Sequence, residues 1–366
     1  MKVSPLLSIV AALPAVLADK NIFIFGDSYS DTGFNVNYTL PNINNAFGNP
    51  NIHGTFGSNG INWLKYLATS YNSSIYYVYD FARGGATVDN AIVTLHDYIP
   101  SFVEQVESMF LPYMTGTGQV ASWSAQDTIV GVWFGINDIL NSYLVYSEAQ
   151  LEVVYNQEIA KSYWSAIETI YKAGARDFFF MLVPPINLRP NLRTSTRPTV
   201  KSAVQEFNSM VTAGAAEFSA GHSDATTTVI DINSLFVDLI SNYQSYGFDN
   251  VTGYCEAYIY GVPFGNTYYS TCPAAISSYF WLNSVHVTTE VHRYVAQAVA
   301  LLLEQEFGLE ASNVNASLDF IKQNVVADVT VSSTLEIDFT TLAATEPTAV
   351  TSKLSKPFGK VWVVQE

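Results

Sequence analysis

Four residues of the chain have side chains or backbone freedom suited to one kind of chemistry. Ser28, Gly85, Asn137 and His286 lie in the stretches IFIFGDSYS, ARGGAT, FGIND and NSVHVT. A serine hydroxyl becomes a nucleophile when a base, most often histidine, accepts its proton. Attack on an acyl carbon produces an oxyanion that fixed N–H donors stabilise. We therefore expect acyl transfer with Ser28 as nucleophile and His286 as base, and with the Asn137 amide and a backbone N–H beside Gly85 as oxyanion donors.

The elements that must position these residues can be predicted from hydrophobic patterning. Short apolar runs, typical of strands covered on both faces, occur at 22–25, 75–80, 128–134, 177–183 and 227–232. Helical patterns occur between or after them, at 59–70, 147–173, 199–220 and 288–306. The alternation predicts a three-layer α/β/α fold with a five-stranded, mostly parallel sheet. Ligands bind at the carboxyl ends of such strands, where Ser28, Gly85 and Asn137 fall.

The residues around Ser28 predict a sharp turn that is held by side chains. Gly26 has no side chain to obstruct the turn. Asp27 and Asp31 can accept hydrogen bonds from nearby backbone N–H groups. Ser28 could be only a turn residue, but the other three stretches favour a chemical role. Asp138, directly after Asn137, is expected to shape its loop.

Of the five histidines, only His286 has neighbours suited to catalysis. His292 is expected within the last helix as a satisfied or exposed residue. His53 lies in a loop rich in Gly and Asn that could border the cleft. His96 and His222 have no context that indicates a role.

The four stretches, in this order, resemble the four blocks of the SGNH/GDSL hydrolases, over roughly residues 20 to 307. FGDSYSDTGFN, GSNGINWLKYLA and FGIND are similar to fungal secreted members of the sixteenth carbohydrate-esterase family. The resemblance implies a flavodoxin-like fold and an acetylesterase acting on partly acetylated plant-wall oligosaccharides. Tyr29 replaces the Leu that names the superfamily, as is frequent in these fungal relatives.

One position departs from the family pattern, which places an Asp three residues before the catalytic His. Asn283 occupies that position here. Its carbonyl could accept the Nδ1–H bond of His286, whereas its NH₂ group would favour the wrong tautomer. Three interpretations stay open: a Ser–His dyad oriented by Asn283, support of the ring by another group, and a weak or inactive site.

The first 18 residues have the pattern of a secretory signal peptide, with Lys2, an apolar run and a small-residue cleavage site. We place the hydrolase domain at 19–310 and an extension of uncertain structure at 311–366.

A secreted chain makes the four Asn-x-Ser/Thr sequons candidate glycosylation sites. These are Asn37, Asn72, Asn250 and Asn315. No later segment is apolar enough to predict membrane insertion.

The two cysteines, Cys255 and Cys272, are expected to form one disulfide in an oxidising compartment.

With a net charge of −16 the chain is a poor partner for nucleic acid. We expect a monomer that needs no cofactor or metal and acts on a small ester or oligosaccharide ester. The alternatives are a GDSL-type lipase or phospholipase and a catalytically weakened glycan-binding relative.

Overall fold

The computed structural model describes residues 19–49, 60–72, 74–260 and 268–309. The chain divides into two compact units, Met1–Glu336 and Ile337–Glu366, and all described residues belong to the first. The predicted signal peptide, the extension at 311–366, His53 and the sequon at Asn315 lie outside the described residues.

A single five-stranded sheet forms the centre of the first unit, and all of its strand pairs are parallel. The strand order is β2-β1-β3-β4-β5. This confirms the predicted fold class and all five predicted strands, with ends that differ by one or two residues. The strands are β1 Lys20–Gly26, β2 Tyr76–Asp80, β3 Thr128–Trp133, β4 Asp177–Met181 and β5 Thr226–Ile230.

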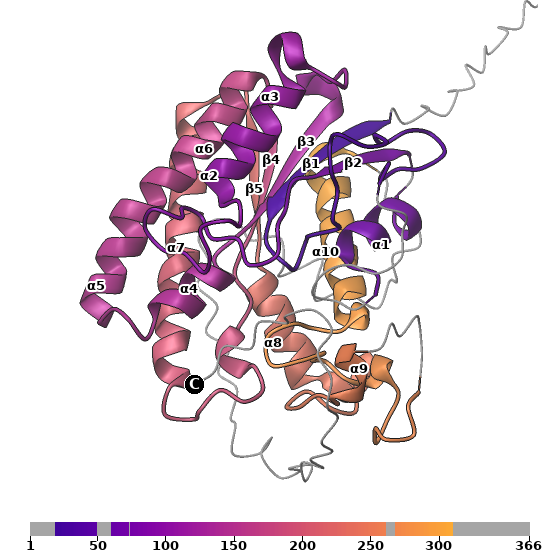
Figure 1. Cartoon of the computed structure of the whole chain (residues 1–366), viewed down its shortest axis with the longest axis vertical. Coiled ribbons are helices and arrows are strands. Elements are labelled where there is room, and N and C mark those ends of the chain that lie inside the picture. The colour runs from indigo at the N-terminus through magenta and orange to yellow at the C-terminus, as the bar shows by residue number, and fades with distance from the viewer. Residues whose placement is uncertain (1–18, 50–59, 73, 261–267, 310–366) are drawn as a thin grey trace, which may run out of the picture. The chain divides into compact units, whose positions relative to one another are not determined.

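Helices cover both faces of the sheet, as Figure 1 shows, with α6 and α7 on one side and α1 and α10 on the other. The helices are α1 Trp63–Ser70, α2 Phe102–Glu104, α3 Leu111–Met114, α4 Ile136–Ser142, α5 Glu148–Val153, α6 Ala160–Ala173, α7 Arg197–Gly221, α8 Ile232–Ser241, α9 Ala257–Tyr260 and α10 Thr289–Phe307. No helix within the described residues is long and apolar enough to cross a membrane.

Two predicted helices differ from the structure. The helix expected over 147–173 is divided into α5 and α6 by a π-helical turn, η4 at Val154–Ile159. A second π-helical turn, η1 at Gln105–Phe110, follows α2. The helix expected from residue 59 begins at Trp63 because Asn62 caps it and accepts a hydrogen bond from the Lys65 N–H.

Tight packing explains the apolar, aromatic strand sequences. Gly131 lies in the middle of β3, where a Cβ atom would come within 2.3 Å of the Phe179 ring. Phe23 and Phe25 of β1 pack against Phe110 with ring centroids 5.5 and 5.6 Å apart. Because β1 and β3 are buried on both faces, the residues that follow them are held on a rigid base.

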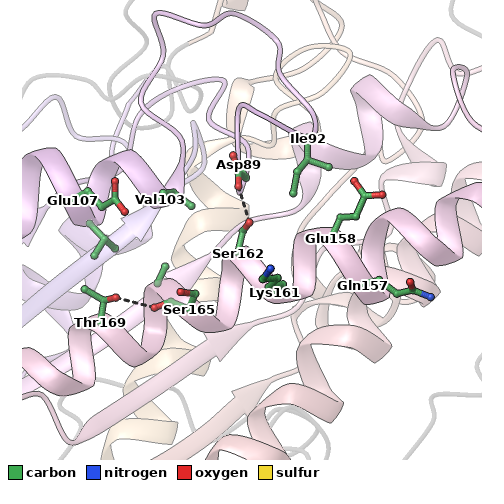
Figure 2. A pocket seen from close by; sticks show the side chains of 12 residues that line it. Asp89, Ile92, Val103, Glu107, Gln157, Glu158, Lys161, Ser162, Ser165 and Thr169 are labelled. Carbon is green, nitrogen blue, oxygen red and sulfur yellow. Dashed lines mark hydrogen bonds between the residues drawn. The ribbon is translucent and has the colours of Figure 1, made fainter.

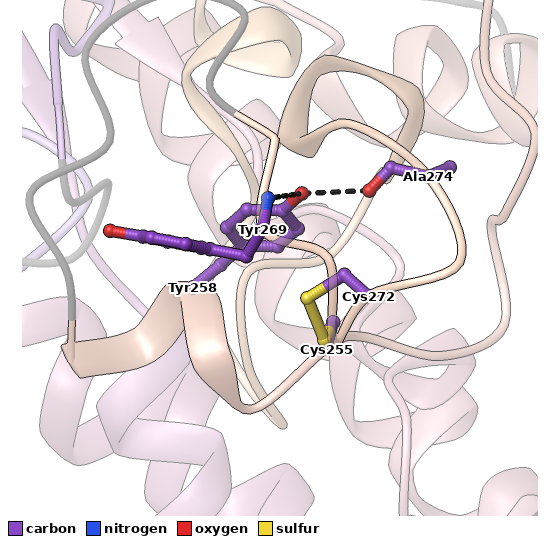
Figure 3. The surroundings of a disulfide bond; sticks show 5 residues. All are labelled: Cys255, Tyr258, Tyr269, Cys272 and Ala274. Carbon is purple, nitrogen blue, oxygen red and sulfur yellow. Dashed lines mark hydrogen bonds between the residues drawn. A yellow bond between two sulfur atoms is a disulfide. The ribbon is translucent and has the colours of Figure 1, made fainter.

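The disulfide between Cys255 and Cys272 is present in the structure, with the two Cα atoms 5.9 Å apart (Figure 3). Cys272 belongs to a small buried cluster with Tyr258, Ile276, Tyr279 and Leu282. The Tyr258 hydroxyl donates to the Ala274 carbonyl at 2.7 Å. The cluster ends at Leu282, so the bridged loop packs against the residue that precedes Asn283.

Candidate active site

Ser28 and His286 meet at the carboxyl edge of the sheet, although 258 residues separate them in the chain. The Ser28 Oγ atom lies 2.7 Å from His286 Nε2. Both side chains are half-buried. Ser28 is on the turn directly after β1, and His286 is three residues before α10. This is the contact that nucleophile and base need.

The turn that carries Ser28 is held from several sides. The Asp27 carboxylate accepts a hydrogen bond from the Tyr29 N–H at 3.0 Å, and Asp31 accepts one from the Gly33 N–H at 2.7 Å. Both aspartates therefore hold local N–H groups, as predicted. Gln105, which sequence reasoning missed, binds both the N–H and the carbonyl of Gly26, at 3.1 and 2.9 Å.

Gly85 lies in a loop whose backbone requires glycine, since its φ angle is +87°. A Cβ atom at this position would come within 2.9 Å of Ile99 Cδ1 and 3.2 Å of Leu95 Cδ2. The segment 91–100 therefore lies directly against Gly85. Sequence reasoning missed this contact, because the hydrophobic side chains of Leu95 and Ile99 look like those of any core residue.

Asn137 joins the Ser28 turn to the Gly85 loop. It lies in the first turn of α4, and its Nδ2 atom donates to the Ala86 carbonyl at 3.0 Å and to Asp27 Oδ2 at 3.4 Å. The structure thus brings the predicted Ser, Gly, Asn and His to one edge of the sheet. The hydrogen bond to Asp27 is the weaker of the two because it is longer.

Asp138 was expected to shape its own loop, but it lies in the first turn of α4 and binds the loop that follows Gly85. Its Oδ1 atom accepts a hydrogen bond from the Val88 N–H at 3.0 Å, and Oδ2 has no hydrogen-bond partner among the described residues. Burial raises the pKa of Asp138 to about 7. Burial, with a smaller effect from Asp138 and Asp31, also raises the pKa of Asp27 to about 7.

Asn283 contacts His286 directly, and of the two contacts that the sequence left open, the structure has the one through the amide nitrogen. Its Nδ2 atom lies 3.1 Å from His286 Nδ1. Its Oδ1 atom accepts hydrogen bonds from the backbone N–H groups of Val285 and His286, at 2.8 and 2.7 Å. Among the three interpretations, this contact places Asn283, and not another group, at Nδ1 of the ring.

Tyr29 and Arg189 hold the backbone of the histidine loop, residues 283–286, and sequence reasoning did not identify either role. The Tyr29 hydroxyl donates to the Val285 carbonyl at 2.7 Å. Arg189 Nη1 lies 3.4 Å from the Ser284 carbonyl. The only available signal was Tyr at position 29, where the family has Leu, because a phenol can donate a hydrogen bond and a Leu side chain cannot.

The surroundings of His286 disfavour its charged form. Burial lowers the pKa of His286 to about 4. Burial, with a contribution from His286, lowers the pKa of His292 to about 3. His292 is in α10, 1% exposed, and its ring lies 5.8 Å from that of Tyr29, so it is a core residue and not a surface one. The His286 imidazole is therefore neutral at neutral and mildly acidic pH.

A separate groove of about 560 Å³ lies beside α6 and the two π-helical turns (Figure 2). Its lining includes Asp89, Glu107, Lys161 and Ser162, and Ser162 Oγ donates to Asp89 Oδ2 at 2.6 Å. None of the predicted catalytic or oxyanion residues lines it. Apolar side chains, among them Ile92 and Val103, complete the lining, so the groove is distinct from the site at Ser28 and His286.

A parallel α/β/α sheet with a serine–histidine pair at its carboxyl edge defines the class of α/β serine hydrolases. The family model "GDSL-like Lipase/Acylhydrolase" matches residues 22–299. The chain therefore belongs to the GDSL family and is a carboxylic ester hydrolase.

The chain is similar to several known proteins. It is 32% identical to an acetylesterase of Thermothelomyces thermophilus over 289 residues, which cover 78% of this chain and 88% of the relative. It is 29% identical to a thermolabile hemolysin of Vibrio parahaemolyticus, over 82% of this chain and 66% of that protein. A solved acetyl xylan esterase variant of Geobacillus stearothermophilus is 15% identical, with a TM-score of 0.41, over 80% of this chain and 95% of that one.

Proposed function

We propose that the protein removes acetyl or other short acyl groups from carbohydrate esters through a covalent acyl-enzyme. The 2.7 Å contact between Ser28 Oγ and His286 Nε2 carries the proposal, because it supplies a nucleophile with a base. The 32% identical relative is an acetylesterase, which supports the choice of acyl group.

In this mechanism His286 moves one proton in each half of the reaction. It accepts the Ser28 proton as Oγ attacks the ester carbon, and it donates that proton to the departing sugar alkoxide. Water then loses a proton to His286 and attacks the acyl-enzyme, and His286 returns the proton to Ser28 as acetic acid leaves. The Asn137 amide turns its weaker hydrogen bond from Asp27 to the oxyanion, beside a backbone N–H near Gly85.

An exposed aromatic ring beside the loop that carries Gly85 supports a sugar as the leaving group. Tyr98 is 65% exposed and belongs to the segment 91–100 that contacts Gly85. Its ring stacks on His96, with centroids 5.1 Å apart and planes 11° apart, so its orientation is held. Sugar rings pack on exposed aromatic faces of this kind.

A lipase or phospholipase is the second candidate. Leu144 and Val145, in the loop after α4, are 67% and 70% exposed, and α4 carries Asn137. Two adjacent exposed apolar side chains near the site could contact a lipid surface. The similarity to a hemolysin is compatible with this candidate.

Ser28 is tested first, by labelling with a serine-directed phosphonate. The label is expected on Ser28 and is expected to be lost in Ser28→Ala. Labelling of another serine in the folded protein would contradict the assignment, and no turnover of any ester would favour the glycan-binding alternative.

A substrate panel then separates the candidates: acetylated xylo-oligosaccharide, p-nitrophenyl acetate and phospholipid vesicles. For a carbohydrate esterase, Tyr98→Ala should raise KM for the oligosaccharide several-fold and leave p-nitrophenyl acetate turnover unchanged. Tyr38→Ala, at an equally exposed tyrosine on another loop, is the control. If Leu144→Ser and Val145→Ser lower vesicle hydrolysis while Tyr98→Ala has no effect, the lipase candidate is favoured.

We also propose that the protein is secreted as a monomer, cleaved after Ala18 and glycosylated. The disulfide is compatible with an oxidising compartment. Asn37 is exposed, whereas Asn72 and Asn250 are half-buried, so Asn37 is the most accessible of the described sequons. N-terminal sequencing, glycosidase treatment and sedimentation test these points.

A further inference from the structure

The hydrogen bonds of Asn283 determine which of its two terminal atoms faces His286. The N–H groups of Val285 and His286 both point at one terminal atom of the side chain, at 2.8 and 2.7 Å. Only an oxygen can accept two N–H donors, so that atom is Oδ1. The atom 3.1 Å from His286 Nδ1 is therefore the NH₂ nitrogen.

This orientation selects one tautomer of the imidazole. The NH₂ group has only hydrogens to offer, so Nδ1 must be the unprotonated, accepting nitrogen. A neutral ring then carries its proton on Nε2, which lies 2.7 Å from Ser28 Oγ. In this state Nε2 donates to the hydroxyl and has no lone pair with which to accept the serine proton.

We propose that Asn283 holds His286 in the Nε2–H tautomer, and that turnover is limited by the small fraction of molecules in which the Asn283 amide is inverted. This inference rests on the proposed roles of Ser28 and His286. Asn283 acts through His286 and is thus a positioning residue. It makes the enzyme a slow esterase with an intact nucleophile.

Inversion is unfavourable because the two demands on Asn283 conflict. Rotating the amide would present Oδ1 to an Nδ1–H group and release Nε2 to act as base. The same rotation turns the NH₂ group toward the N–H groups of Val285 and His286, and both hydrogen bonds are lost. Tyr29 and Arg189 bind the carbonyls of the same loop, so the backbone is held and cannot readily follow.

An aspartate at position 283 would satisfy both demands together. One carboxylate oxygen would accept the two backbone N–H bonds, and the other would accept from Nδ1–H of His286. Asn283→Asp should therefore raise kcat/KM at least tenfold. The reverse change, Asp to Asn, costs a serine protease about 10⁴-fold through the wrong tautomer, which sets the upper limit.

The test is ¹⁵N NMR of histidine-labelled protein together with kinetics. The shifts distinguish protonated from unprotonated ring nitrogens, and His286→Gln assigns the signals. The wild type should show a protonated Nε2, and Asn283→Asp a protonated Nδ1 with faster turnover. Asn191→Asp is the control, because it adds the same charge at an exposed site in the segment 190–196, where Asn191 contacts Tyr254, and should leave rate and tautomer unchanged.

A protonated Nδ1 in the wild type would overturn the inference, even if the variant failed to fold. A folded Asn283→Asp protein with unchanged or lower kcat/KM would overturn it as well. The proposed function fails separately, if phosphonate does not label Ser28, because the NMR measurement does not require turnover.

Discussion

Asn137 makes the contacts that unite the candidate site, since one amide nitrogen reaches both Ala86 and Asp27. A donor that stabilises the oxyanion acts in the transition state more than in the bound substrate. Asn137→Ala should therefore lower kcat by about 10²- to 10³-fold with a small change in KM. Steady-state kinetics on p-nitrophenyl acetate measure this, with a melting curve to confirm folding. A change in KM alone would assign Asn137 to substrate binding.

The environment of His286 predicts an unusually acid pH limit for activity. In the proposed mechanism His286 accepts a proton only when its ring is neutral, and burial lowers its pKa from the usual value of about 6.5 to about 4. The groups against the ring are Ser28, Asn283 and Tyr29, which are neutral, while His292 also has a lowered pKa. As pH falls, kcat/KM should hold through pH 6 and decline near pH 4.

Asn283→Asp should move this decline to higher pH, because an adjacent carboxylate favours the imidazolium form. Rates measured from pH 3 to pH 8 test both statements. A decline of the wild-type rate near pH 6.5 would show that His286 is far more solvated than its contacts indicate.

At the scale of elements, most of the sheet could be predicted from sequence, because β1 to β4 are short, apolar and buried on both faces. Their positions after β1 and β3 also indicated Ser28 and Asn137, and the position just before the last helix indicated His286. The π-helical turn η4 and the contact of segment 91–100 with Gly85 were not predictable, since both depend on tertiary packing. The orientation of the Asn283 amide depends on two backbone N–H groups whose directions the sequence does not reveal.

Gly85 provides a test at this scale, because its backbone and its neighbours both exclude a side chain. Gly85→Ala would strain a residue at φ +87° and press a methyl group against Ile99. Both stability and esterase activity should fall, with kcat/KM falling more than tenfold. Gly116→Ala is a matched control, because Gly116 also has a positive φ of +59° but has open space around it.

The control should lose about 1 kcal/mol of stability from the backbone conformation alone and keep full activity. Chemical denaturation and kinetics of the two variants separate strain from active-site damage. Equal losses of activity in both would mean that the contact with segment 91–100 has no part in catalysis.

For the molecule as a whole, buried ionisable groups near the site predict how stability changes with pH. Burial raises the pKa values of Asp27, Asp80 and Asp138 to about 7, from a usual value near 4. In the folded protein these groups bind protons as pH falls through 7, whereas in the unfolded chain they stay ionised until about pH 4. Their contribution to the free energy of unfolding therefore rises as pH falls from about 8 to 4.

His286 and His292 oppose this trend, because burial lowers their pKa values to about 4 and 3. The unfolded chain takes up their protons from about pH 6.5 downward, while the folded protein does not. The stabilisation that the three carboxyl groups contribute as pH falls exceeds the destabilisation from the two imidazoles. It also begins at a higher pH. A net charge of −16 adds to the trend, since repulsion within the folded protein weakens as carboxylates are neutralised.

The protein should therefore melt at a higher temperature at pH 5.5 than at pH 8. Asp138→Asn should reduce that difference, because it removes one buried carboxyl group while an amide oxygen can still accept from the Val88 N–H. Glu158→Gln, which removes an exposed carboxyl group, is the control and should leave the difference unchanged. Calorimetry at the two pH values measures all three proteins. A wild-type melting temperature that is higher at pH 8, together with no effect of Asp138→Asn on the difference, would contradict the raised pKa values of these carboxyl groups.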